Sequence, residues 1–144
     1  MQHIQRSALV NHTAEQMFDL VNDIERYPEF MRGCRAARVI TSSDTMLEGE
    51  LTLAKAGMQQ TFTTRNTLRR PERIDMELVS GKFKNFSACW QFQSLTSEAC
   101  KVSLFMDFEF DSALVGFAAE KLFSSVANDQ LDSLVARADR LYGS

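Results

Sequence analysis

Apolar and polar residues alternate through the middle of the chain, between Cys34 and about Asp111. The clearest run covers residues 102–110, where every second side chain is apolar and only Phe105 interrupts the polar side. Comparable runs lie at residues 47–53, 62–68, 74–78 and 86–92. Turn-forming residues separate them at positions 42–45, 57, 70–72, 81 and 96–98. Alternation predicts strands with one buried face and short turns join neighbouring strands, so this region predicts an antiparallel meander of about six strands.

The N-terminal segment changes its pattern twice. The stretch HIQRSALV predicts a strand, and TAEQ, which starts at Thr13, is a capping box that begins a helix. Apolar residues at helical spacing extend this helix to Ile24. Pro28 lacks an N–H and disfavours helical geometry at Tyr27, so the helix is expected to stop there. Because proline is allowed as a first helical residue, PEFM predicts a second short helix.

The last part of the chain returns to a period of 3.6 residues. A helix is predicted from Ser112, a suitable N-cap, to about Tyr142, with Gly143 as its stop. At 1.5 Å per residue such a helix is roughly 40 Å long. Its apolar stripe contains Leu114, Ala118, Leu122, Val126, Leu131, Leu134, Ala138 and Leu141, broadened by Phe117, Phe123, Ala127 and Val135.

This order of elements predicts an α+β protein with a helix-grip fold. A curved antiparallel sheet of about seven strands wraps around the long C-terminal helix, because each then covers the apolar face of the other. The two short helices after the first strand lie at the open end of the sheet, where YPEFM closes the mouth of the core. No repeat, linker or low-complexity segment divides the chain, so residues 1–144 are expected to form one domain.

Composition and charge narrow the classes of function. With 16 Lys and Arg against 19 Asp and Glu, the net charge of −3 does not favour a general attraction to nucleic acid, and DNA is not an expected partner. The three cysteines have neither CxxC nor zinc-finger spacing and fit a reducing compartment. The N-terminus lacks a signal-peptide pattern, and no apolar run is long enough to span a bilayer. We therefore expect a cytoplasmic protein, with peripheral contact to the inner membrane as a second expectation.

Catalytic and metal chemistry are not indicated by the motifs. His3 and His12 have neither a histidine partner one helical turn away nor a nearby cysteine ligand. The chain has no GxSxG elbow and no phosphate-binding glycine loop. Asp107 and Glu109 form a carboxylate pair on one strand face, but their alternation with apolar neighbours predicts that they face solvent. We expect a binding protein rather than an enzyme, with no metal and no required cofactor.

Four separated stretches carry a resemblance to a known family. LVNDIERYPEFMRGC, KAGMQQTFTTRN, GKFKNFSACWQF and MDFEF resemble, in this order, the START-like coenzyme Q-binding family of the polyketide cyclase/dehydrase superfamily. The chain is most similar to the short bacterial members of this family, some of which are called ribosome association toxins. One position departs from the pattern, because Arg32 stands where the family usually has a proline.

The resemblance implies an internal apolar cavity that holds ubiquinone or a related isoprenoid lipid, in support of respiratory electron transfer. The implied lining is Tyr27, Phe30 and Met31 at the mouth, Phe62, Trp90, Phe92 and Phe108 from the sheet, and Phe117 and Phe123 from the last helix. Thr64 and Asn66 are candidates to bind the quinone carbonyl, or else form an internal polar pair satisfied by its neighbours. Without the resemblance, such a face rich in Phe and Met is typical of an ordinary core.

The resemblance also implies an alternative function, that of a ribosome association toxin. Such a protein binds the large ribosomal subunit and inhibits translation initiation by blocking subunit joining. Two basic clusters are candidate surfaces for RNA or membrane: Arg32, Arg35 and Arg38 after the mouth, and Lys82 and Lys84 on either side of Phe83. Basic residues interleaved with aromatic ones suit anionic lipid as well as RNA, and a solvated turn is the alternative interpretation.

Overall fold

The computed structural model describes residues 1–55, 57–111 and 116–143, and it confirms the helix-grip architecture. Seven antiparallel strands form one sheet in the order β1-β7-β6-β5-β4-β3-β2, so β1 and β2 are its edges. The elements are β1 (Gln2–Val10), α1 (Ala14–Asn22), the 3-10 helix η1 (Ile24–Glu29), β2 (Cys34–Ser42), β3 (Met46–Lys55), β4 (Met58–Arg69), β5 (Arg73–Ser80), β6 (Phe83–Thr96), β7 (Ala99–Phe110) and α2 (Phe117–Tyr142).

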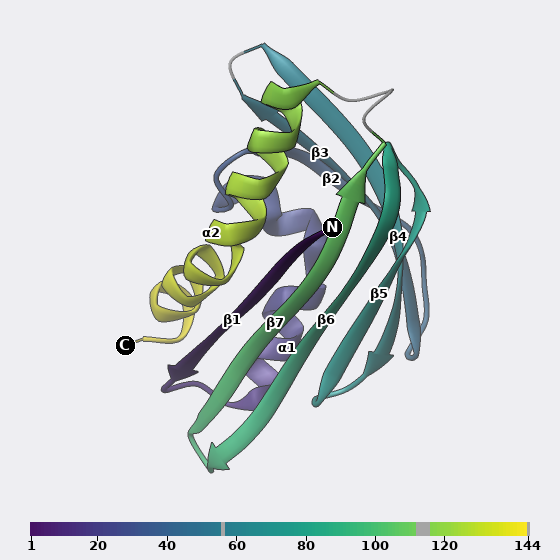
Figure 1. The fold of residues 1–144 in the computed structure, drawn as a ribbon. Helices are drawn as coiled ribbons and strands as arrows, with labels where there is room; N and C mark the ends of the chain where they lie inside the picture. Colours follow the sequence, from purple (N-terminus) through teal and green to yellow (C-terminus); the bar gives the residue numbers. More distant parts are fainter. Residues whose placement is uncertain (56, 112–115, 144) are drawn as a thin grey trace.

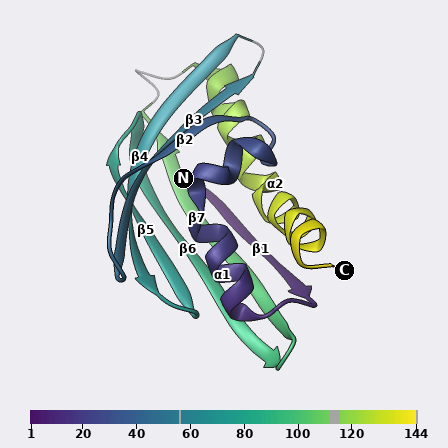
Figure 2. The same ribbon diagram turned by 180° about the vertical axis from the view of Figure 1, so that it is seen from behind.

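The sheet is curved, and all helices lie on one of its faces (Figures 1 and 2). The strands from β2 to β7 follow one another as the predicted meander, and β1 joins the sheet by pairing with β7. In Figure 2, α2 runs diagonally past η1 and α1 on the same side of the sheet. This arrangement buries the apolar face of the sheet beneath the helices and leaves its other face to solvent.

The short helices differ in part from the prediction. The capping box of α1 is present, because Thr13 Oγ1 accepts from the Gln16 N–H at 3.1 Å and the Thr13 N–H donates to Gln16 Oε1 at 2.9 Å. The second helix does not begin at Pro28 but is a 3-10 helix with Pro28 inside it. In a 3-10 helix residues three apart share one side, which allows both Ile24 and Tyr27 to be buried. This shared burial, rather than the proline, decides where the second helix starts.

The long helix ends as predicted, at Gly143, which has a φ of 89°. It begins at Phe117 after Gly116, and the predicted N-cap Ser112 and the stripe residue Leu114 lie outside the described residues. Its 26 residues span about 39 Å. The stripe residues of its middle part are buried, except that Val126 and Val135 are half-buried, whereas Ala118 and Leu141 near its two ends are exposed. The predicted stripe is therefore wrong at both of these positions, because the sheet covers only the middle of the helix.

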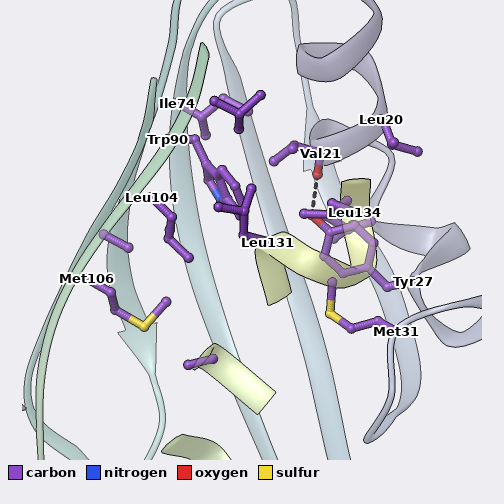
Figure 3. Close-up of a cluster of buried hydrophobic side chains, with 14 of the residues drawn as sticks. Leu20, Val21, Tyr27, Met31, Ile74, Trp90, Leu104, Met106, Leu131 and Leu134 are labelled. Carbon is purple, nitrogen blue, oxygen red and sulfur yellow. Dashed lines mark hydrogen bonds between the residues drawn. The ribbon is translucent and has the colours of Figure 1, made fainter. Parts of the chain in front are cut away.

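The core lies between the sheet and α2. Paired residues on three neighbouring strands, Ile74, Trp90 and Leu104, form a row on the inner face of the sheet. Figure 3 shows Trp90 pointing toward Leu131 of α2, and Tyr27 beside Leu134. Because full burial of a large apolar side chain contributes about 1.5–3 kcal/mol, such rows supply most of the stability of the domain.

Candidate functional site

The interior that was predicted to hold a lipid is made of contacting side chains. Most of the predicted lining residues are buried there, namely Tyr27, Met31, Phe62, Thr64, Asn66, Trp90, Phe92, Phe108 and Phe123. Two small pockets that several of these residues line measure about 20 and 30 Å³. A single water molecule needs about 10–15 Å³ of such space, whereas ligand pockets measure about 300–1,000 Å³. In this structure the residues therefore pack as a core.

A cluster of phenylalanine rings fills the end of this interior near the start of α2. Phe123 contacts the rings of Phe108, Phe83 and Phe62 at centroid distances of 4.9, 5.0 and 5.6 Å, all edge to face. Phe83 also stacks on Phe110 at 4.6 Å. Such edge-to-face pairs contribute about 0.5–1.5 kcal/mol each beyond their buried area. Each ring of the cluster therefore packs against other rings of the cluster.

Two predicted lining residues lie elsewhere. Phe117 is 72% exposed on the first turn of α2, where Lys121 Nζ lies 5.0 Å from its ring centroid. Phe30 is half-buried on the outer side of the domain, where the guanidinium carbon of Arg137 lies 5.1 Å from its ring centroid. Both positions carry an aromatic residue at a helix end, and burial there depends on whether the sheet reaches that far. The prediction that Phe117 lines the interior is wrong, and Phe30 faces an outer groove.

Polar groups of three interior residues, Tyr27, Thr64 and Asn66, are bound to protein partners. Thr64 Oγ1 donates to Asn66 Oδ1 at 2.9 Å, which is the internal polar pair that the sequence left as an alternative. The Tyr27 hydroxyl donates to the carbonyl of Val21 in α1, as Figure 3 shows. Burial raises the pKa of Tyr27, so this hydroxyl remains protonated at neutral pH. The bond joins η1 to α1 and holds the aromatic-rich segment against the core.

The outer surface has a groove of about 520 Å³ between the segment after η1 and the second half of α2. We call it the arginine groove, since Arg32, Arg137 and Arg140 line it together with Glu29, Phe30, Asp129, Asp132, Ser133 and Ala136. Arg137 Nη2 donates to Glu29 Oε1 at 3.1 Å. Hydrogen bonds from Arg26 and from Arg137 hold the pKa of Glu29 below its usual value. The carboxylate therefore stays ionised and fixes the guanidinium of Arg137.

Only one member of the first predicted basic cluster belongs to this groove. Arg38 donates to Glu50 at 3.0 Å and Arg35 donates to Gln59 at 2.8 Å, so both are engaged along the sheet. Arg32 instead joins two arginines of α2 that lie more than 100 positions later in the chain. The spacing of Arg137 and Arg140, three residues apart on a predicted helix, was the signal that the sequence contained.

The second predicted basic cluster has a different geometry. Lys82 and Lys84 are exposed, but the ring of Phe83 between them packs inward against Phe110 and Phe123. Phe83 is therefore half-buried, with its ring engaged by other aromatic rings of the protein. An insertion of Phe83 into a membrane, as the sequence suggested, requires that this packing be given up.

The remaining candidate groups offer little catalytic chemistry. Within the described ranges no three His, Cys, Asp or Glu side chains gather as a metal site. His12, which is buried, bonds Asp139 of α2 at 2.8 Å, and the exposed His3 bonds Asp107. Asp107 is exposed as predicted, while Glu109 is half-buried and accepts from Asn85 at 3.1 Å. Among the helices that the structure describes, none has the length and hydropathy needed to span a membrane.

The cysteines are free and are held in the thiol form. Burial raises the pKa of Cys34 to about 11, and it also raises the pKa of Cys89 and Cys100. Because the thiolate is the reactive form, these groups are poor nucleophiles at neutral pH.

These thiols predict a loss of stability in alkali. The pKa of a cysteine in an unfolded chain is about 8.5, whereas burial raises the pKa of Cys34 to about 11 in the folded protein. Between these values the unfolded chain binds fewer protons, so the free energy of unfolding decreases as the pH rises. Urea titrations at several pH values in this window are expected to show the decrease. Cys34→Ala should show a shallower slope, and an identical slope in both proteins would contradict this assignment.

The curved antiparallel sheet that grips a long C-terminal helix defines a START-like domain. The chain belongs to the polyketide cyclase / dehydrase and lipid transport family, whose model matches residues 10–135. It is 43% identical to the ribosome association toxin RatA of Pseudomonas aeruginosa, over 98% of each chain. It is 39% identical to RatA of Escherichia coli, over 99% of this chain and 90% of the relative.

Solved structures confirm the fold. The Zhui aromatase/cyclase from Streptomyces superimposes with a TM-score of 0.80 over 96% of this chain and 94% of its own, at 16% sequence identity. At such an identity the likeness concerns architecture alone, because one fold supports many chemistries. Catalysis by that enzyme therefore carries no implication for this chain.

The prediction of a ubiquinone-binding protein for respiration is wrong as the main function. The relatives that match nearly the whole chain at 39–43% identity are named as ribosome association toxins. A coenzyme Q-binding protein, COQ10 homolog B of Xenopus laevis, is only 23% identical, and the match covers 58% of its length. The four matching stretches identified the family correctly but did not separate its branches.

Proposed function

We propose that this protein binds the ribosome and inhibits translation initiation by blocking the joining of the ribosomal subunits, with the large subunit as its target. The observation that carries the proposal is the identity of 39–43%, over at least 98% of this chain, to relatives named ribosome association toxin. Ribosomes occupy the cytoplasm, which is where this role places the protein.

The structure supports a role for the outer surface rather than the interior. The pockets among the inner residues measure only about 20 and 30 Å³, so these residues are largely in contact with one another. The described cysteines are protonated thiols, and the histidines are bonded to Asp107 and Asp139. A protein of this kind acts by occupying a surface of its partner, and we infer that it is a binding protein and not an enzyme.

Sucrose-gradient sedimentation of extracts from cells that overproduce the protein tests the proposal. We expect fewer assembled ribosomes and more free subunits, with the protein in the large-subunit fractions. In a purified system, protein added to separated subunits should prevent their association. This order of addition distinguishes blocked joining from a general arrest of growth.

A folding-defective variant provides the control for overproduction itself. Leu134 is completely buried on α2, and Leu134→Asp places an unpaired charge in the core. This variant is expected to unfold and to leave the gradient profile unchanged. A normal profile with the wild-type protein, together with its absence from every ribosomal fraction, would overturn the proposal.

A further inference from the structure

The arginine groove brings together arginines from separate elements of the chain. Arg32 comes from the turn between η1 and β2, whereas Arg137 and Arg140 lie one turn apart on α2. None of the ion pairs found among the described residues includes Arg32 or Arg140. Figure 2 shows η1 beside α2, which brings these distant parts of the chain together. Both arginines are thus exposed, and no carboxylate of the described residues forms an ion pair with either of them.

The acidic residues of the groove are largely neutralised by other arginines. Arg6 Nη2 donates to both carboxylate oxygens of Asp132, at 3.1 and 3.2 Å. Arg26 donates to Glu29 at 3.0 Å, in addition to the bond from Arg137. Asp129 is the remaining carboxylate of the lining. The lining holds three arginines and three carboxylates, and Arg6 and Arg26 pair with two of these carboxylates from outside it, which leaves Arg32 and Arg140 as its arginines without an ion pair among the described residues.

Arg137 is held in place, but several of its N–H donors have no hydrogen-bond partner among the described residues. Its guanidinium packs against the Phe30 ring, and the structure shows one hydrogen bond from it, to Glu29. Its buried Nε has no acceptor among the groups that the structure describes. An arginine carries five N–H donors in a rigid planar fork, which matches phosphate geometry. A pre-positioned arginine loses little conformational freedom when it binds an anion.

We infer that the arginine groove is an RNA-binding surface, in which Arg32 and Arg140 contact backbone phosphates on either side of the fixed Arg137. This inference deepens the proposed function, because it names RNA as the part of the ribosome that the protein contacts. Bidentate arginine contacts are typical of phosphate recognition, and the half-buried Phe30 ring adds an aromatic surface at the groove. The three arginines come from two elements of the chain. Three guanidinium groups suit a series of successive phosphates better than they suit a single carboxylate.

The lysine pair at the other basic site provides a matched comparison. Lys82 and Lys84 are also exposed and also free of the ion pairs found in the described part of the chain. Their aromatic neighbour Phe83 stacks on Phe110, and the two lysines lie two positions apart at the start of β6 rather than on elements that are distant in the chain. Loss of either pair changes the net charge equally, so any difference in RNA binding reports position and not charge alone.

The test is fluorescence anisotropy of a labelled RNA hairpin with three proteins: wild type, Arg32→Ala/Arg140→Ala and Lys82→Ala/Lys84→Ala. We expect the arginine variant to bind on the order of tenfold more weakly, and the slope of log Kd against log salt to fall by about 2. The lysine variant should bind as the wild type does. Thermal unfolding of each variant verifies that the exposed substitutions leave the fold intact.

The outcomes separate this inference from the proposed function. Equal loss in both variants, or no loss in the arginine variant, would overturn the groove as the RNA site. Displacement of the hairpin by poly-glutamate at the same charge concentration would also overturn it, in favour of an acidic protein segment. Sedimentation of the same proteins with ribosomal subunits is the independent measurement. If the wild type fails to sediment with subunits while hairpin binding still depends on the arginines, the proposed function fails and the groove assignment stands.

Discussion

Replacing Trp90 by alanine is expected to lower the free energy of unfolding by about 3–5 kcal/mol, the range found when large aromatic residues are removed from cores. Trp90 is 1% exposed and lies parallel to Phe92, at an angle of 11° and a centroid distance of 6.4 Å. Its strand neighbours Ile74 and Leu104 are equally buried and belong to pleated strands that cannot close in on the space. Urea denaturation monitored by circular dichroism measures this loss.

Phe117→Ala is the control, because it also removes an aromatic ring from a residue that was predicted to line the interior. Phe117 is 72% exposed, so its loss is expected to change the stability by no more than about 0.5 kcal/mol. A loss as large as that of Trp90→Ala would show that Phe117 is buried after all. A cost below about 1 kcal/mol for Trp90→Ala would instead contradict a tightly packed core.

Gly33→Ala is expected to destabilise the protein by about 3 kcal/mol, since it combines backbone strain of about 1–3 kcal/mol with a steric overlap. Gly33 has a φ of 87°, and a Cβ built there would lie 2.6 Å from Cγ2 of Val126 in α2. The Gly33 carbonyl also accepts from the Ala54 N–H at 2.9 Å, which holds the segment against β3. The residue is therefore clamped between α2 and the sheet, next to Arg32 of the arginine groove.

Gly57→Ala separates these two contributions. Gly57 has a similar φ of 81°, but a Cβ built there has no heavy atom within 4 Å other than those of Gly57 itself and its two chain neighbours. This variant is expected to show the backbone strain alone, so it should cost less than Gly33→Ala in the same chemical denaturation experiment. In the double variant Gly33→Ala/Val126→Ala the overlap is relieved, and part of the loss should be recovered. Equal costs at both glycines, with no recovery, would show that Val126 moves aside freely.

The strands, the capping box and the C-terminal stop of α2 could be predicted from the sequence because each depends on local chemistry. The alternation in residues 102–110 reappears in β7, where Val102, Leu104, Met106, Phe108 and Phe110 are all buried. Thr13 and Gln16 are three residues apart, and their reciprocal bonds need no distant partner. The type and the bounds of the 3-10 helix were not predicted, because the burial of Ile24 and Tyr27 depends on β3 and α1.

The candidate site was predicted less well than the fold. The sequence identified residues with the composition of a lipid-binding interior, but a packed core and a lipid-binding cavity have the same pattern of apolar residues. Likewise, it placed Arg32 in a cluster with Arg35 and Arg38, which the structure assigns to partners along the sheet. Side-chain packing decides how much space remains, and such packing involves elements that are far apart in the chain.

The sequence by itself therefore determined the class of fold, the order of its elements and the face that each strand buries, because these follow from periodicity and local capping. Only the tertiary structure decided that the interior is filled, that Phe117 is exposed and that Arg32 lies in one groove with Arg137 and Arg140. The physical reason is that these properties depend on how closely α2 approaches the sheet and η1. That distance is set by all the side chains at the contact together, and no single stretch of sequence contains it.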